Sequence, residues 1–143
     1  MGKDHTPFPK LLLDLLADRI GLASVNSMTK YRHGAVDFTL AKHALTAGLP
    51  PLSLVDETYW GLRGDEARLQ LIASAPEDGA ERPQLWTRDQ DGGRVFVSIP
   101  GHYNWTFDDP FFRILAFRGI CWAAGQPMDR LAELAPIGAR IEE

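Results

Sequence analysis

The stretch PQLWTRDQDGGRVFVSI, residues 83–99, decides the fold class of this chain. Its turn Asp91-Gly92-Gly93 separates two apolar runs, and such a turn between strand-like runs is the strongest hairpin signal in the sequence. From Arg94 to Ile99 the side chains alternate with a period of two, which is typical of a strand. We therefore expect a β-hairpin here, preceded by a polar surface loop over residues 75–82.

The remaining elements are expected on both sides of this hairpin. Alternating or short apolar runs predict strands over residues 35–41, 52–59 and 69–74, and helical spacing predicts a helix over 8–20. A second helix, over 110–124, has Asp108 or Asp109 as its cap and Gly125 at its end, and it is apolar on nearly every side. Two helices with about five strands indicate an α/β or α+β fold. Because two helices cannot cover both faces of a parallel sheet, either the sheet is partly antiparallel or covering elements lie outside this chain.

Composition narrows the classes of function. With 143 residues, 45% of them hydrophobic, the chain is long enough for one domain, or for part of one. A net charge of -4 disfavours binding to nucleic acid, and no apolar run approaches the length of a membrane span. The single cysteine, Cys121, lies in an apolar helix and is expected to be a buried thiol. Low cysteine usage and an N-terminus without an export signal favour a soluble, cytoplasmic protein.

Two polar segments that follow apolar runs are candidates for chemistry. His102 comes directly after the predicted strand ending at Ile99, and open α/β sheets bind ligands at the carboxyl ends of strands. On a strand, Glu57 and Tyr59 would share one face, while Asp56 would point to the other as a structural hydrogen-bonding group. We predict that His102 and Glu57 line one concavity; the alternatives are a histidine bonded to a neighbouring loop and a carboxylate in a solvated turn.

Several short motifs, taken together in their order, resemble the ThuA-like (trehalose utilisation) family. They are His43 with residues 46–50, then 56–59, then 93–96 with 101–102, and finally 118–120 with 122–123. The resemblance implies a class I glutamine-amidotransferase-like fold, which is a flavodoxin-like three-layer α/β sandwich, here with a mixed sheet that includes the C-terminal hairpin. It also implies that residues 1–143 are the C-terminal portion of a longer domain.

By the same resemblance, the family's polar cleft would draw on a defined set of residues, with Arg94 and Trp86 supporting it. This set is His43, Asp56, Glu57, Tyr59 and His102. Two positions depart from the family pattern: Ala44 replaces a proline, and Tyr103 stands where an acidic residue is common.

Three hypotheses for function follow, of which the first two are the main ones. In the first, the protein acts on trehalose, a related disaccharide or an oxidised sugar. Its catalytic residues would be His102, Glu57 and Asp56, and its substrate contacts His43, Tyr59, Trp105 and Arg94. In the second, the chain is a non-catalytic sugar-binding or interaction module of the same fold. The third adds a divalent metal such as zinc, held by His43, His102 and a carboxylate. A second copy of the chain or a missing N-terminal segment would cover the apolar helix over 110–124.

Overall fold

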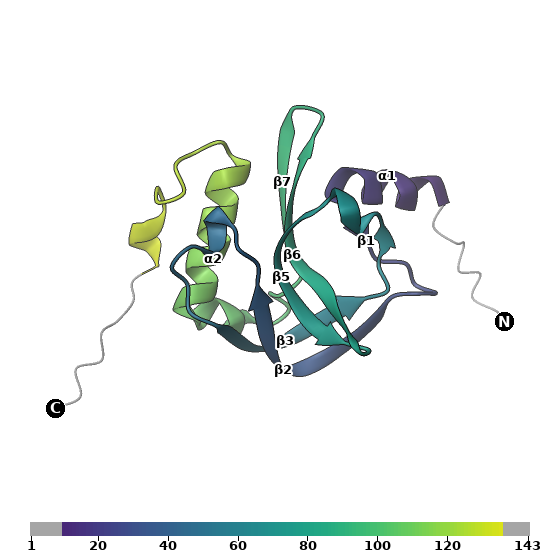
Figure 1. The fold of residues 1–143 in the computed structure, drawn as a ribbon, viewed down its shortest axis with the longest axis horizontal. Helices are drawn as coiled ribbons and strands as arrows, with labels where there is room; N and C mark the ends of the chain where they lie inside the picture. The colour runs from purple at the N-terminus through teal and green to yellow at the C-terminus, as the bar shows by residue number, and fades with distance from the viewer. Residues whose placement is uncertain (1–9, 136–143) are drawn as a thin grey trace.

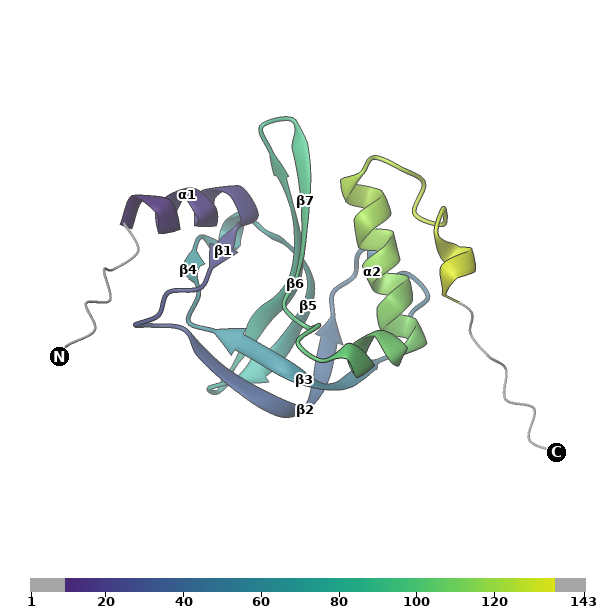
Figure 2. The ribbon, with the colours of Figure 1, turned by 180° about the vertical axis from the view of Figure 1, so that it is seen from behind.

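Five strands form one strongly curled sheet, in the order β3-β2-β5-β6-β7, and the computed structural model describes residues 10–135 of the chain (Figure 1). The helices and strands are α1 (Lys10–Ile20), β1 (Leu22–Ala23), β2 (Lys30–Leu40), β3 (Leu52–Trp60), β4 (Arg63–Gly64), β5 (Gln70–Glu77), β6 (Ala80–Gln90), β7 (Gly93–Ser98) and α2 (Pro110–Ala123). The short strands β1 and β4 pair separately. In both views, α1 and α2 lie on opposite sides of the β6–β7 hairpin (Figures 1 and 2).

All strand pairs among the described residues are antiparallel. The expected mixed sheet is therefore wrong for this part of the chain, and the flavodoxin-like three-layer arrangement is not confirmed. The connections explain the difference. Parallel neighbours need a long crossover, usually a helix, whereas β5, β6 and β7 follow one another through two-residue turns. Residues 41–51, which join β2 to β3, contain only the short 3₁₀ turn Ala44–Thr46.

The two hairpin turns have the same backbone geometry. Asp91 and Gly92 have φ values of 47° and 79°, and Asp78 and Gly79 have 55° and 76°, as expected where both central residues are left-handed. The hairpin predicted at Asp91 is confirmed. The predicted surface loop over 75–82 is wrong, because these residues form the end of β5, the turn and the start of β6. Its polar composition misled the prediction, since Glu77 is buried in the fold against a cation from another strand.

The helix predicted over 110–124 is confirmed as α2. The Asp109 carboxylate caps it by accepting a hydrogen bond from the backbone N–H of Phe112 at 2.8 Å. Phe112 and Leu115 enter the core, whose other buried members come from the sheet and from Leu45. The residues of α2 are buried or half-buried except Ile120, which is 52% exposed. Cys121 is buried, as predicted.

Helix α1 confirms the first predicted helix from Lys10 onward, while Phe8 lies outside the described residues. It presents an apolar stripe of Leu12, Leu15 and Leu16 to the surface and buries Ala17. Neither of the two described helices is long and apolar enough to cross a membrane.

Candidate functional site

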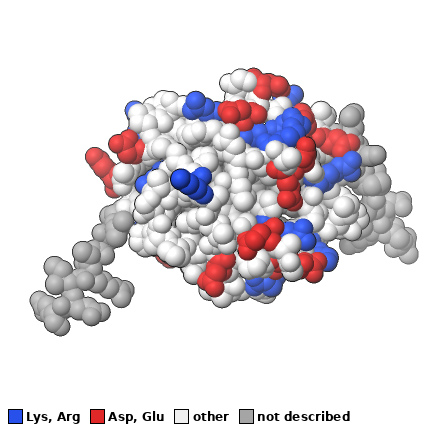
Figure 3. Space-filling model, in the orientation of Figure 1, with Lys and Arg blue, Asp and Glu red and all other residues white. Residues whose placement is uncertain are grey.

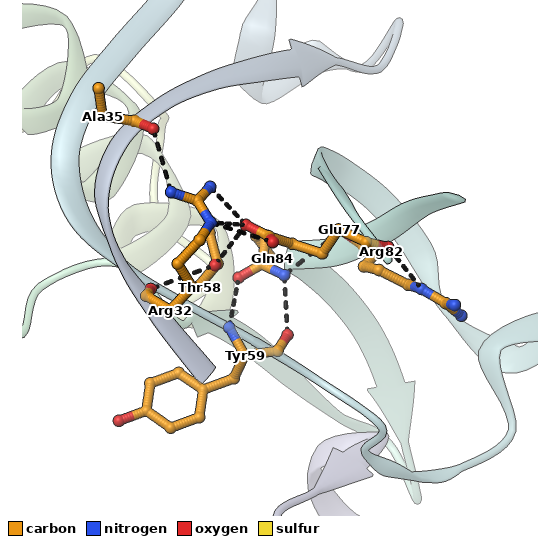
Figure 4. Close-up of polar contacts among 7 residues, drawn as sticks. All are labelled: Arg32, Ala35, Thr58, Tyr59, Glu77, Arg82 and Gln84. Atoms are coloured by element: carbon orange, nitrogen blue, oxygen red, sulfur yellow. Dashed lines mark hydrogen bonds and ion pairs between the residues drawn. The ribbon is translucent and has the colours of Figure 1, made fainter. Parts of the chain in front are cut away.

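The free edge of β3 positions the site, because the segment after β7 crosses this edge. Trp105 donates its indole N–H to the carbonyl oxygen of Val55 at 2.8 Å. Further along the edge, the amide of Gln84 donates to the carbonyl oxygen of Tyr59 at 2.8 Å and accepts from its N–H at 3.2 Å (Figure 4). Side chains thus replace a neighbouring strand at the edge, which leaves fewer unpaired backbone groups there.

Asp56 holds the loop that carries His102. Its fully buried carboxylate accepts hydrogen bonds from the N–H groups of Gly101 at 2.8 Å, His102 at 3.2 Å and Glu57 at 2.7 Å, and from the hydroxyl of Thr106. Buried carboxylates need this many partners, because an unpaired buried charge is costly. The geometry agrees with the expectation that Asp56 is a structural hydrogen-bonding group.

Glu57 points to the opposite face of β3 and meets both Tyr59 and His102. The Tyr59 hydroxyl donates to Glu57 Oε2 at 2.6 Å, and the same oxygen lies 3.4 Å from His102 Nδ1. The prediction that Glu57 shares a face with Tyr59 is confirmed, and Glu57 also contacts His102. A histidine and a carboxylate in contact can transfer and stabilise a proton, which is the basic requirement of acid/base chemistry.

Tyr59 is held in its protonated form at neutral pH. The hydrogen bond to Glu57, together with burial and the nearby negative charge of Glu57, raises the pKa of Tyr59 to about 12. A phenol with such a high pKa stays a hydrogen-bond donor, so it fixes the orientation of the Glu57 carboxylate.

An open groove of about 480 Å³ lies between β7, the following loop and α2. Tyr59 and His102 line it, whereas Glu57 does not, so the prediction that His102 and Glu57 line one concavity is wrong for this groove. Of the two groups in contact, only His102 lies at its wall. The other walls are mostly apolar and come from Phe96, Ile99, Pro100, Phe107, Phe112, Ala116 and Ile120, with Ser98 and Gly101. A mostly apolar groove with a few polar groups is the usual form of a small-molecule site.

Further aromatic and imidazole groups surround the Glu57 cluster. His33 pairs with Glu57 across β2 and β3, and its Nδ1 lies 2.8 Å from the Tyr103 hydroxyl. The Tyr103 ring stacks on Trp105 with centroids 4.2 Å apart and packs edge-on against His102. Sequence reasoning missed His33 because the strand was predicted to begin at residue 35; its alternation with Tyr31 was the available signal.

The family model for ThuA, described as trehalose utilisation, matches residues 16–123, which cover every strand, the loop after β7 and α2. The chain belongs to the ThuA family. Membership gives it a role related to trehalose utilisation. No curated protein and no solved structure matches the chain at a significant level.

Of the residues that the ThuA resemblance placed in or beside the cleft, Tyr59 and His102 line the groove, and the others do not: His43, Asp56, Glu57, Arg94 and Trp86. His43 caps the turn Ala44–Thr46 through its Nδ1, which accepts from the N–H of Leu45 at 3.1 Å, and it lines a separate surface hollow. Arg94 donates to the carbonyl oxygen of Trp122 at 3.1 Å and lies over its ring. Trp86 is buried against α1, where its indole N–H donates to the carbonyl oxygen of Ile20.

The hypothesis of a metal site finds no support in this arrangement. Within residues 10–135, the structure places no group of three or more His, Cys, Asp or Glu side chains where they could hold a metal ion.

We expect the Tyr59 hydroxyl to lose its proton at a higher pH than an ordinary tyrosine. This titration step should be absent in Tyr59→Phe. Because its pKa is raised from 10.0 to about 12 in the folded state, its contribution to stability is complete below pH 10 and is lost as the pH rises through 12. Ultraviolet absorbance of tyrosinate, followed through a pH titration of both proteins, measures the step. If the step that is missing in Tyr59→Phe lies at the ordinary pKa of 10.0, the bond to Glu57 is contradicted.

Proposed function

We propose that the groove binds trehalose, a related disaccharide or an oxidised sugar, and that His102 is the general acid/base that acts on it. The observation that carries this proposal is the position of one oxygen, Glu57 Oε2, which accepts a hydrogen bond from Tyr59 and lies beside His102 Nδ1; Tyr59 and His102 both line the groove. Family membership supports the sugar as the class of ligand.

The contact between His102 and Glu57 gives each nitrogen of His102 a different role. A carboxylate beside Nδ1 favours the tautomer that carries its proton there, and this leaves Nε2 free to take a proton from a sugar hydroxyl or from a carbon next to a carbonyl. The 3.4 Å separation from Glu57 is longer than a good hydrogen bond, and we expect it to shorten when the ligand excludes water. Asp56 positions His102 from behind and does not touch the ligand.

The apolar walls fit the chemistry of a sugar ring. Pyranose rings have apolar C–H faces that pack against aromatic side chains, and the groove supplies Phe96 and Phe107. The polar hydroxyls of the ring would then meet Tyr59 and His102. Binding and chemistry thus use different walls of the same groove.

The second candidate is a non-catalytic sugar-binding module. Trp105 is 49% exposed and lies flat on Tyr103, and such a rigid aromatic surface binds a sugar without any proton transfer. The two functions differ in whether turnover occurs and whether it needs His102.

Trehalose and an oxidised derivative of it are the probes that test these functions. Binding is followed by NMR signals of the groove residues, and turnover by analysis of the sugar. If the first function is right, His102→Gln lowers turnover by a factor on the order of 10² to 10⁴ while binding changes little. His43→Gln, a histidine outside the groove, is the matched control and leaves turnover unchanged.

Binding without turnover in the wild-type protein, lost in Trp105→Ala and retained in His102→Gln, would establish the second function. If neither sugar changes any signal of the groove, of Trp105 or of Tyr103, both candidate functions are wrong.

A further inference from the structure

A second, charged concavity lies between α1 and the β1–β4 pair. It has a volume of about 340 Å³. It is lined by Asp14, Ala17, Asp18, Gly21, Arg63, Gly64, Asp65, Arg68 and Arg88. The space-filling view shows charged side chains gathered on the side of the molecule where α1 lies, while the side of α2 is largely uncharged (Figure 3). None of the lining residues also lines the groove beside His102.

Arg88 is the unusual member of this concavity. Its side chain, which projects from β6, is 3% exposed. Its Nη1 donates one long hydrogen bond, 3.4 Å, to the carbonyl oxygen of Ala17, and its buried Nη2 has no hydrogen-bond partner among the described residues. A guanidinium has five N–H donors, and burying it without partners is costly. Arg88 therefore has N–H donors that remain available to bind an anion.

Asp18 is the counter-ion nearest to Arg88, but Arg68 shares it. One oxygen, Asp18 Oδ1, lies 3.6 Å from Arg88 Nη2 and accepts a hydrogen bond from Arg68 at 3.1 Å. The hydrogen bond from Arg68 is the main reason that the pKa of Asp18 is lowered. Asp18 is 47% exposed, so it covers Arg88 from the solvent side and can turn outward.

The other two carboxylates in the concavity already have partners. Asp14 pairs with Arg63 at 2.6 Å, and the Asp65 carboxylate accepts from the N–H of Ala67 at 3.0 Å. Arg68 and Arg88 thus converge on a single carboxylate oxygen at the concavity. An oxyanion with two or three oxygens satisfies two guanidinium groups better than one shared oxygen does.

We propose that this concavity binds a small molecule through an oxyanion group, a phosphate or a carboxylate, which Arg68 and Arg88 hold. The oxyanion takes the place of the Asp18 side chain, which turns toward solvent. This oxyanion site is independent of the proposed function at His102, because α1 and α2 lie on opposite sides of the β6–β7 hairpin (Figures 1 and 2).

Inorganic phosphate and acetate, added separately to the full chain, test the oxyanion site by NMR. The Trp86 indole is the reporter, because it donates to the carbonyl oxygen of Ile20, directly before Gly21 in the wall of the concavity. We expect saturable shifts of the Trp86 and Arg88 signals with at least one of the two anions. The stronger of the two identifies the class of oxyanion.

Two variants should change this affinity in opposite directions. Arg68→Gln removes one donor and is expected to weaken binding roughly tenfold, whereas Asp18→Asn removes the competing charge and is expected to strengthen it. Arg19→Gln is the matched control, because Arg19 lies on the same helix as Asp18 but pairs with Asp91 outside the concavity.

Three results would overturn the oxyanion site. They are the absence of saturable shifts with both anions, equal affinity in Arg68→Gln and in the wild-type protein, and weaker binding in a folded Asp18→Asn variant. If Asp18→Asn does not fold, the affinity of Arg68→Gln alone decides, since the exposed Arg68 side chain can be replaced with little effect on folding.

Discussion

Asp56→Ala is expected to destabilise the protein by about 3–5 kcal/mol and to abolish ligand binding in the groove. The substitution leaves the N–H groups of Gly101 and His102 and the hydroxyl of Thr106 without their acceptor. The loop after β7 then loses its attachment to β3, and His102 no longer lies beside Glu57. Chemical denaturation measures the free energy of unfolding, and NMR with trehalose measures binding.

Asp37→Ala is the matched control for this prediction. Asp37 is an exposed carboxylate on β2 with one hydrogen bond, from the Ser53 hydroxyl, so its loss should change stability by less than about 0.5 kcal/mol. Two variants of equal stability would show that the four hydrogen bonds to Asp56 do not hold the loop.

Arg32→Met should destabilise the protein by about 2–3 kcal/mol at neutral pH. Arg32 contacts both carboxylate oxygens of Glu77: Nη2 and Nε lie 2.6 Å and 3.0 Å from Oε1, and Nε lies 3.1 Å from Oε2 (Figure 4). Thr58 also donates to Oε1. Glu77 is 6% exposed, so removing Arg32 leaves a buried carboxylate without its cation. The expected loss is below that of a fully buried pair because Arg32 is partly solvated.

The pH dependence of stability gives this prediction a second measurement. Burial raises the pKa of Glu77, but the hydrogen bonds from Arg32 and Thr58 outweigh it, and the net effect is a pKa below its ordinary value of 4.5. The pair therefore stabilises the fold above that pH and loses its effect as the pH falls through the lowered pKa. In Arg32→Met, urea denaturation should show a deficit in stability that is largest at neutral pH and shrinks as the pH falls through the lowered pKa of Glu77 in the wild-type protein.

Lys30→Met provides the control for the ion pair. Lys30 pairs with Asp78 next to the Arg32 pair, at 2.7 Å, but both side chains are more than half exposed. Exposed pairs contribute about 0–1 kcal/mol, so this variant should be close to the wild-type protein. If Lys30→Met and Arg32→Met are equally destabilised, burial of Glu77 is not the cause.

Local patterns were enough to predict several parts of this protein from its sequence. Alternation of side chains indicated the strands and placed Glu57 and Tyr59 on one face, because successive strand residues point to opposite sides whatever the rest of the fold does. The Asp-Gly turn before β7 and the Asp109 cap of α2 also depend only on neighbouring residues. The family could also be recognised from the sequence alone, because its motifs are short runs of neighbouring residues.

The tertiary structure alone decided how these parts come together. The segment over 75–82 has the same Asp-Gly turn signal as residues 91–92, but its polar Glu77 is buried because Arg32, on the neighbouring strand β2, neutralises it. His102 meets Glu57 because Asp56 accepts hydrogen bonds from a loop that follows another strand, while His43 and Arg94, which the motifs suggested, make other contacts. Such contacts depend on how the sheet curls and on which donors reach a buried carboxylate, and neither is encoded in the spacing of neighbouring residues.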